Sequence, residues 1–458
     1  MLDLLVCNGT VVTAHGSFDL DVGVEGGRVA GLFARGFAPA AAAVVDARGQ
    51  LVLPGVVDAH VHCRAPERPD REDFGSATRA AAAGGVTTIC EMPISTPSVH
   101  SAAVVRERRA LGERECYVDF ALWGAGGAPA EDVLAMAEEG VCAFKIFLHA
   151  PAPGRETAFA GLCVTDNYGL YRALANTRQT GLYCAVHAED NDLIRVLTDD
   201  LRAAGRGDPA AHGESRPPFV ENIAVGKLLM LADELGAPLY LPHISTAGAV
   251  DMVREAKACG MDVVLETCPH YLLFEESVIA RVGPYGRINP PIRAQAEVDA
   301  LWEGLLDGTV DVVASDHSPF VVAEKEPYWH DIWGALSGHP GLETLAPSLL
   351  SAALDGRLTF ERAVEVLCER PAKALGLYPQ KGTIVPGGDA DLVLFDPQAE
   401  WAVDRTQMLT KARDTARLFD GATLRGRVTK TVVRGTVVYE DGRVVGPAGH
   451  GKFVKPRR

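Results

Sequence analysis

The chain has 458 residues, of which 47% are hydrophobic and 23% charged, a balance typical of a globular protein rather than a disordered or fibrous one. Its 44 lysines and arginines against 60 aspartates and glutamates give a formal net charge of −16. This acidic balance argues against nucleic acid or an anionic membrane surface as a partner. A chain of this length fits about three domains, or one large α/β barrel with a small satellite domain.

The cysteines and the first residues bear on the location of the protein. The ten cysteines stand singly, with no CxxC pair and no spacing typical of a disulfide framework. The start, MLDLLVCNGTVVTAHG, has neither a basic stretch nor the apolar run of a signal peptide, and no apolar run in the chain is long enough to cross a bilayer. We therefore expect a cytoplasmic protein with reduced thiols and no membrane anchor.

Both ends of the chain predict β-structure. Short runs rich in β-branched residues alternate with glycine-containing turns over residues 4–14, 18–33, 42–55, 382–397 and 426–445. Two β-rich ends that flank a different middle predict one small β-sandwich, built from residues 1–54 and 385–458.

Between these ends the hydrophobic period changes. Apolar strand-like runs alternate with amphipathic helical segments, a pattern typical of a parallel sheet with crossover helices. The predicted strands cover residues 56–62, 86–93, 142–148, 182–189, 238–245, 262–272 and 310–317. The predicted helices include residues 72–85, 167–181, 221–236, 249–260, 296–308 and 360–375. Over residues 55–384 this favours a (β/α)8 barrel. An open doubly wound sheet is the alternative, although no GxGxxG sequence opens the first strand–helix unit.

Polar residues stand at or near the C-terminal ends of the predicted barrel strands, where barrel enzymes carry their catalytic groups. They are His60, His62, Lys145, His187, His243 and Asp316. His60 and His62 are two residues apart, so on a strand both imidazoles point to one face and could bind one metal ion. An HxH pair by itself is more often a surface or packing feature. Four histidines and an aspartate at strand ends together predict a metal site.

Lys145 is the unusual member of this set. Its neighbours Phe144 and Ile146 predict burial, and a buried ammonium is costly unless it is paired or neutral. The side chain could extend to the barrel rim or pair with a carboxylate. Alternatively, the neutral amine could react with carbon dioxide to give a carbamate whose two oxygens bridge two metal ions. Charge supports the carbamate, because an ammonium would repel both ions.

These motifs resemble those of the cyclic amidohydrolases, the family of dihydroorotases, hydantoinases (dihydropyrimidinases) and allantoinases. The resemblance rests on residues 55–93 and on FKIFL, VHAED, PHIST, ETCPHYL, INPPIR, SDHSPF and GLET, and it covers nearly the whole chain. It implies a (β/α)8 barrel with a β-sandwich and a two-metal centre. The implied ligands are His60, His62 and Asp316 for one metal ion, His187 and His243 for the other, and N6-carboxylysine at Lys145 as the bridge.

The resemblance also implies the reaction, the hydrolysis of a ring amide. Two divalent ions, expected to be Zn²⁺ although Mn²⁺, Co²⁺ and Fe²⁺ also suit these ligands, would activate a shared water, with Asp316 as the proton-transfer group. A homo-oligomer, a dimer or tetramer, is implied by the family alone. A serine hydrolase is disfavoured because no GxSxG sequence follows a strand. A non-catalytic scaffold relative would have lost ligands, whereas all six positions are filled here.

Signals for the substrate conflict. Arg64 follows the HxH pair as in dihydroorotases, where an arginine binds the substrate carboxylate, but it could instead pair with Glu67 or Glu72. The MPNT motif of dihydroorotases is changed here to the sequence MPIS at residues 92–95, which lacks the asparagine. ETCPHYL and SDHSPF look more like allantoinases and hydantoinases. We therefore predict a hydantoinase- or allantoinase-like ring opener acting on a small cyclic amide, with dihydroorotase as the alternative.

Three further residues are candidates for substrate contact. Asn289 in INPPIR matches a substrate-contacting position of the family. Ser337 stands near the position where hydantoinases have a substrate-contacting asparagine. Hydantoinases also have a tyrosine soon after the bridging lysine, and the segment FLHAP of this chain has His149 there and no tyrosine. Asn289 and Ser337 could equally satisfy their own turns. Residues 321–340 are long, aromatic and bounded by Gly and Pro, which predicts either a loop over the barrel mouth or an ordinary packed excursion.

Overall fold

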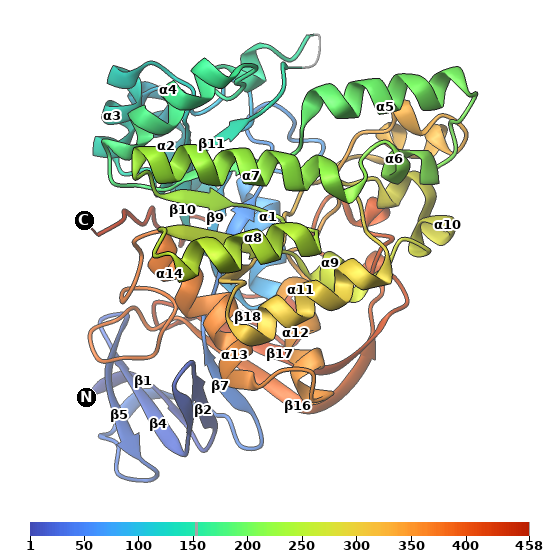
Figure 1. The fold of residues 1–458 in the computed structure, drawn as a ribbon. Coiled ribbons are helices and arrows are strands. Elements are labelled where there is room, and N and C mark those ends of the chain that lie inside the picture. The colour runs from blue at the N-terminus through green and yellow to red at the C-terminus, as the bar shows by residue number, and fades with distance from the viewer. Residues whose placement is uncertain (152–153, 458) are drawn as a thin grey trace.

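The centre of the protein is a closed barrel of parallel strands, seen in a computed structural model that describes residues 1–151 and 154–457 (Figure 1). Its strands are β8 (Val56–Val61), β9 (Val86–Glu91), β10 (Asp119–Ala125), β11 (Ala143–Phe147), β12 (Cys184–His187), β13 (Leu239–Leu241), β14 (Val263–Thr267) and β15 (Val312–Val313). Neighbours pair in chain order from β8 to β15. The amide of His62 donates to the carbonyl of His317 at 2.9 Å, which joins the first strand to the last. The predicted (β/α)8 barrel is confirmed.

Amphipathic helices cover the outside of the barrel. The main ones are α1 (Phe74–Ala83), α2 (Ala102–Glu115), α3 (Ala130–Glu139), α4 (Asn167–Arg178), α7 (Pro218–Leu235), α8 (Ala247–Ala258), α11 (Gln295–Asp307) and α12 (Leu345–Leu354). In α11 the buried residues Val298, Leu301, Trp302 and Leu305 recur at helical spacing, so one stripe faces the strands. Asp73 caps α1 by accepting a hydrogen bond from the amide of Ser76.

Further helices extend the loops around the barrel. They are α5 (Asn191–Ala203), α6 (Ala210–Glu214), α9 (Pro269–Leu273), α10 (Val278–Val282), α13 (Phe360–Val364) and α14 (Arg370–Ala374). None of the helices within residues 1–151 and 154–457 is long and apolar enough to cross a lipid bilayer.

The structure differs from the predicted elements in one missed strand, one strand end and one divided helix. The strand β10 was not among the predicted segments, although all its residues are buried. The predicted strand 262–272 ends at Thr267, because Pro269 favours the first turn of α9. The predicted helix 360–375 is divided into α13, a π-turn over Glu365–Glu369 and α14, which accommodates Pro371, a residue without a backbone N–H.

Two further sheets lie beside the barrel, at the lower part of Figure 1. One has the order β5-β4-β1-β6, and the other β19-β18-β17-β16-β7-β2-β3. The N-terminal strands are β1 (Leu2–Cys7), β2 (Thr10–Thr13), β3 (Gly16–Phe18), β4 (Leu20–Glu25), β5 (Arg28–Ala34), β6 (Ala41–Asp46) and β7 (Leu51–Pro54). The C-terminal ones are β16 (Leu392–Ala402), β17 (Thr423–Val433), β18 (Thr436–Glu440) and β19 (Arg443–Val444).

The pairing of β7 with β16 joins the two ends of the chain, as the sequence predicts. Buried side chains of both ends, such as Val11, Val22, Leu392 and Val432, form one apolar cluster between these sheets. The domain boundaries themselves stay a prediction. The end of the chain returns to the barrel, where Phe453 forms a parallel bridge with Phe120.

Candidate active site

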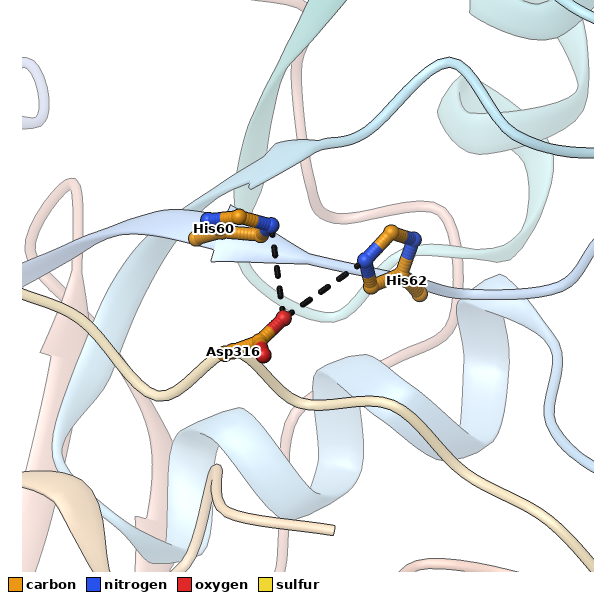
Figure 2. A group of neighbouring side chains, drawn as sticks. All are labelled: His60, His62 and Asp316. Atoms are coloured by element: carbon orange, nitrogen blue, oxygen red, sulfur yellow. Dashed lines mark ion pairs between the residues drawn. The ribbon is translucent and has the colours of Figure 1, made fainter. Parts of the chain in front are cut away.

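His60, His62 and Asp316 form a compact buried group at the C-terminal end of the barrel strands. His60 lies in β8 and His62 follows directly after it, and Asp316 follows β15 and points toward both (Figure 2). The Nε2 atoms of His60 and His62 lie 3.3 and 3.6 Å from Oδ1 of Asp316. Asp316 has a left-handed backbone with φ of 45°, a conformation that costs energy in a non-glycine residue and often marks a functional site.

Glu266 at the end of β14 fixes the orientation of His60. Its Oε1 lies 2.9 Å from Nδ1 of His60 and accepts the backbone N–H of His243, and its Oε2 accepts the hydroxyl of Tyr240 at 2.6 Å. A neutral imidazole carries one N–H, so donation from Nδ1 to this carboxylate leaves Nε2 with its lone pair toward Asp316. This carboxylate–histidine arrangement is common behind metal ligands.

His187 and His243 form a second pair beside the first. Nδ1 of His187 lies 3.2 Å from Nε2 of His243, and the rings of His60 and His243 have centroids 5.3 Å apart. Nε2 of His187 lies 2.8 Å from Oε2 of Glu189, which also accepts from Arg216. Burial lowers the pKa of His187 to about 4, so its ring is neutral and its Nδ1 lone pair faces His243.

The ionisation of Glu189 supports this assignment. Its burial alone would raise the pKa, but the guanidinium of Arg216 and the hydrogen bond from His187 outweigh that effect and hold the pKa below its usual range. Glu189 is therefore a carboxylate that can only accept from the histidine.

Lys145 lies on β11 within the same cluster. Its side chain is 1% exposed, and its Nζ has no hydrogen-bond partner among the described residues. Burial lowers its pKa to about 8, against an opposing effect of the carboxylates of Glu266 and Asp316. A buried amine with a lowered pKa and no partner is suited to carry a further group, because its neutral form is accessible near neutral pH.

Together these side chains meet the requirements of a metal site. Two imidazole nitrogens and a carboxylate oxygen are grouped closely enough in His60, His62 and Asp316 to hold one ion. When Nδ1 of neutral His60 donates to Glu266, the lone pair of its Nε2 faces Oδ1 of Asp316 at 3.3 Å, and these two acceptors repel each other unless a cation lies between them. The buried His and Asp groups could therefore bind divalent metal ions, with nitrogen and oxygen ligands of the kind that Zn²⁺ accepts.

A cavity of about 430 Å³ opens in front of this group. All ten residues singled out in the sequence line it: His60, His62, Arg64, Lys145, His149, His187, His243, Asn289, Asp316 and Ser337. Oδ1 of Asn289 is buried there without a hydrogen-bond partner, and Nδ1 of His149 lies 2.7 Å from the carbonyl of Ala150. The segment 333–338, part of the predicted loop, forms one wall of the cavity.

Arg64 does not make the rim pairs that the sequence left open. Its Nη2 donates to Oγ of Ser318, and no ion pair joins it to Glu67 or Glu72 in the part of the chain that the structure describes. Glu72 instead accepts from the hydroxyl of Thr410. Arg64 is thus free to face the cavity.

Several residues of the site were not predicted from the sequence. They are Glu266, Tyr240, Glu189, Arg216, Ser318, Phe320, Arg155 and Arg287. Glu189 stands two residues after His187, so its place in VHAED could have indicated its role. Glu266 lies 206 residues from His60 in the chain, and no local signal connects them.

Comparison with known proteins places this geometry in a family. The model of the amidohydrolase family matches residues 51–438. The L-hydantoinase of Paenarthrobacter aurescens is 38% identical over 461 residues, covering 100% of this chain and 99% of the relative. The allantoinase of Rubrobacter xylanophilus is 38% identical over 462 residues, covering 100% of this chain and 98% of the relative.

Solved structures of related enzymes have the same fold as this chain. The L-hydantoinase (dihydropyrimidinase) from Arthrobacter aurescens superposes with a TM-score of 0.94 at 37% identity, covering 99% of this chain and 100% of that one. Dihydropyrimidinase from Brevibacillus agri gives a TM-score of 0.91 at 30% identity, with 100% of both chains covered. The relatives confirm the predicted class, a hydantoinase- or allantoinase-like hydrolase. The chain belongs to the amidohydrolase family.

Proposed function

We propose that this enzyme opens the ring of a cyclic ureide or imide by hydrolysing a ring amide, as a hydantoinase or an allantoinase would. The observation that carries this proposal is the convergence of four histidines and Asp316 beside the amine of Lys145, which has no hydrogen-bond partner among the described residues, in a cavity of about 430 Å³. The similarity to hydantoinases and allantoinases over the full chain supports it. The same similarity disfavours the alternative that the protein is a non-catalytic scaffold relative.

The proposed ligands follow the two groups of side chains. The first divalent ion would be held by His60, His62 and Asp316, and the second by His187 and His243. We propose Zn²⁺ as the metal at both positions. We propose that Lys145 is carboxylated and bridges them, which accounts for a buried amine without a partner. Two bound ions would supply an activated water and polarise the amide carbonyl.

The chain's own residues would position and move the proton. Asp316 faces His60 and His62 through Oδ1, and we propose that it accepts the proton of the attacking water and returns it to the leaving ring nitrogen. Glu266 and Glu189 hold the histidines in fixed orientation during this transfer.

The substrate contacts are also proposals. Asn289 offers a buried amide oxygen without a partner, which suits a ring N–H. Ser337 lines the same cavity, and its hydroxyl can donate to a ring carbonyl group. Nε2 of His149 can accept from a ring N–H, because its Nδ1 donates to the carbonyl of Ala150. Dihydroorotase activity stays the second candidate because Arg64 lines the cavity without a carboxylate partner.

The assembly and location of the enzyme are proposals as well. We propose a homo-oligomer, a dimer or tetramer, and Phe219, Ile223 and Met230 support it because they are exposed on one face of α7. Light scattering after size-exclusion chromatography tests it.

A cytoplasmic location fits the ten cysteines, all of them free.

The replacement Lys145→Ala tests the function. We expect the wild type to contain two metal ions per chain and to open at least one of hydantoin, dihydrouracil, allantoin and dihydroorotate. Lys145→Ala should lose metal and at least about 10³-fold in kcat, since the bridge and both ion positions are disturbed. Lys373→Ala, at an exposed lysine of α14, is the control and should behave as wild type. A Lys145→Ala enzyme with unchanged metal content and activity would refute the proposal.

A further inference from the structure

The cavity is rich in arginine, in contrast to the acidic chain as a whole. Arg64, Arg155, Arg216 and Arg287 line it, against the carboxylates of only Glu189 and Asp316 among the described residues. Arg216 is committed to Glu189. The positive charge of the cavity beyond this pair comes from the other three arginines, Arg64, Arg155 and Arg287.

Arg287 is committed to the cavity wall. Its Nη1 donates to the carbonyls of Ile332 and Trp333 at 2.5 and 3.0 Å, and to that of Ala335. These bonds hold the segment 332–338 in place, so we assign Arg287 a structural role. Arg64 and Arg155 then stand as the two cavity arginines that bind neither a carboxylate nor a backbone carbonyl in residues 1–151 and 154–457.

Arg64 is a buried cation with unused donors. It is 7% exposed, its Nε has no hydrogen-bond partner, and its guanidinium carbon lies 5.0 Å from the centre of the Phe320 ring. Arg71 lies over the same ring at 4.7 Å, but its guanidinium binds Glu324 at 2.6–3.1 Å. One of two neighbouring arginines thus has its carboxylate within the chain, whereas Arg64 lacks one. Leaving a buried charge without a partner is costly, so an external anion is the natural complement.

Arg155 adds a second guanidinium on the same side. It stacks over Phe159 at 5.1 Å, and no side-chain hydrogen bond or ion pair holds it in the described part of the chain. Arg64 and Arg155 line the same cavity of about 430 Å³, and the positive charge of Arg155 acts on the guanidinium of Arg64. These two groups repel each other in the free enzyme, and one carboxylate between them would relieve that repulsion.

We propose that Arg64 and Arg155 form an anion subsite that selects cyclic ureides bearing a carboxylate on a short aliphatic arm. This inference rests on the proposed ring-opening function and names its substrate class. Ile94 and Phe159 line the same cavity and suit the methylene groups of such an arm. Arg155 is therefore a specificity-determining residue.

A matched pair of substrates tests the subsite: hydantoin-5-propionate and its neutral, nearly isosteric amide, hydantoin-5-propionamide. We expect the wild type to prefer the acid by about 10- to 100-fold in kcat/KM, the range that a charge-assisted hydrogen-bond pair supplies. Arg155→Gln and Arg64→Gln should each reduce this preference by about tenfold or more. Arg155→Lys, which keeps the charge, should restore part of it.

The control is Arg172→Gln. Arg172 also stacks on an aromatic ring, that of Tyr168, but it lies exposed on α4 outside the cavity. It should leave the acid-to-amide preference at the wild-type value. Titration calorimetry of both compounds on each variant measures the same preference as affinity, whether or not the ring is opened.

The outcomes separate the two proposals. Equal turnover and equal binding of acid and amide by the wild type, or a preference that neither Arg155→Gln nor Arg64→Gln changes, would overturn the anion subsite while ring opening stands. Preferential binding of the acid without opening of any ring would instead support the subsite and count against the proposed function.

Discussion

Glu266 orients two of the proposed metal ligands. It contacts His60, His243 and Tyr240 at once. In Glu266→Gln an amide NH₂ replaces one carboxylate oxygen, so one of these three donors loses its acceptor. We predict a metal affinity about 10- to 100-fold weaker, as for other residues that orient metal-binding histidines. Competition with a chelator, followed by elemental analysis, measures it.

Tyr240→Phe is the matched control, because it removes one of the hydrogen bonds to Glu266 and keeps the carboxylate. Its effect on metal affinity should be smaller than that of Glu266→Gln. If Glu266→Gln holds its metal as tightly as the wild type, the carboxylate does not orient the ligands and this account of the site is wrong.

At the residue scale, the sequence predicted which polar side chains stand at the ends of the strands, but it did not predict their hydrogen-bond and ion-pair partners. His60 and His62 could be singled out because a period of two places both on one face of a strand. Glu266 could not be, because its contact with His60 depends on how β14 and β8 face each other across the barrel interior. The unpaired state of Arg64 is equally a property of three-dimensional packing.

At the scale of elements, hydrophobic period predicted seven of the eight barrel strands. It missed β10, the longest of the barrel strands, whose sequence DFALWGA follows no strong turn signal. It also extended the strand at 262–272 through a proline that starts α9. Periodicity reports burial, whereas element ends depend on local backbone chemistry such as that of Pro269 and Pro371.

One contact between elements predicts a pH dependence of stability. Glu343, in the turn before α12, accepts the backbone N–H groups of Leu409 and Thr410 at 2.8 and 3.1 Å and has no cationic partner among the described residues. Burial raises its pKa from 4.5 to about 8, with a further contribution from Glu72. Between these two values the folded chain binds a proton that the unfolded chain has lost, so the free energy of unfolding falls as pH rises.

Glu343→Gln should remove this dependence, because the amide oxygen still accepts the backbone N–H groups and carries no titrating proton. We predict a flatter profile of urea unfolding midpoint between pH 5 and 8, with the variant more stable than the wild type at pH 8. Glu234→Gln, at an exposed glutamate of α7, should keep the wild-type slope. Parallel profiles for wild type and Glu343→Gln would contradict the prediction.

At the scale of the whole molecule, a buried cluster of charges joins the barrel to the terminal sheets. Nζ of Lys381 lies 2.7 and 3.0 Å from carboxylate oxygens of Asp391 and Asp389, and it also binds Asp119 of β10. Arg434, between β17 and β18, pairs with Asp119 as well. The three carboxylates are close enough to hold a metal ion, but the ammonium of Lys381 already lies among them. The cluster is therefore an internal ion network.

Lys381→Met tests how much the union of barrel and terminal sheets depends on this network. The side chain is 1% exposed, and its removal would leave buried carboxylates without their cation, so we predict a loss of about 3–5 kcal/mol in the free energy of unfolding. Lys373→Met breaks a half-exposed pair with Glu369 and should cost less than about 1 kcal/mol. Urea unfolding, followed by tryptophan fluorescence, measures both. Because Lys381 lies outside the substrate cavity, the folded variant should keep wild-type kcat, and equal stability losses in the two variants would show that the network does not hold the parts together.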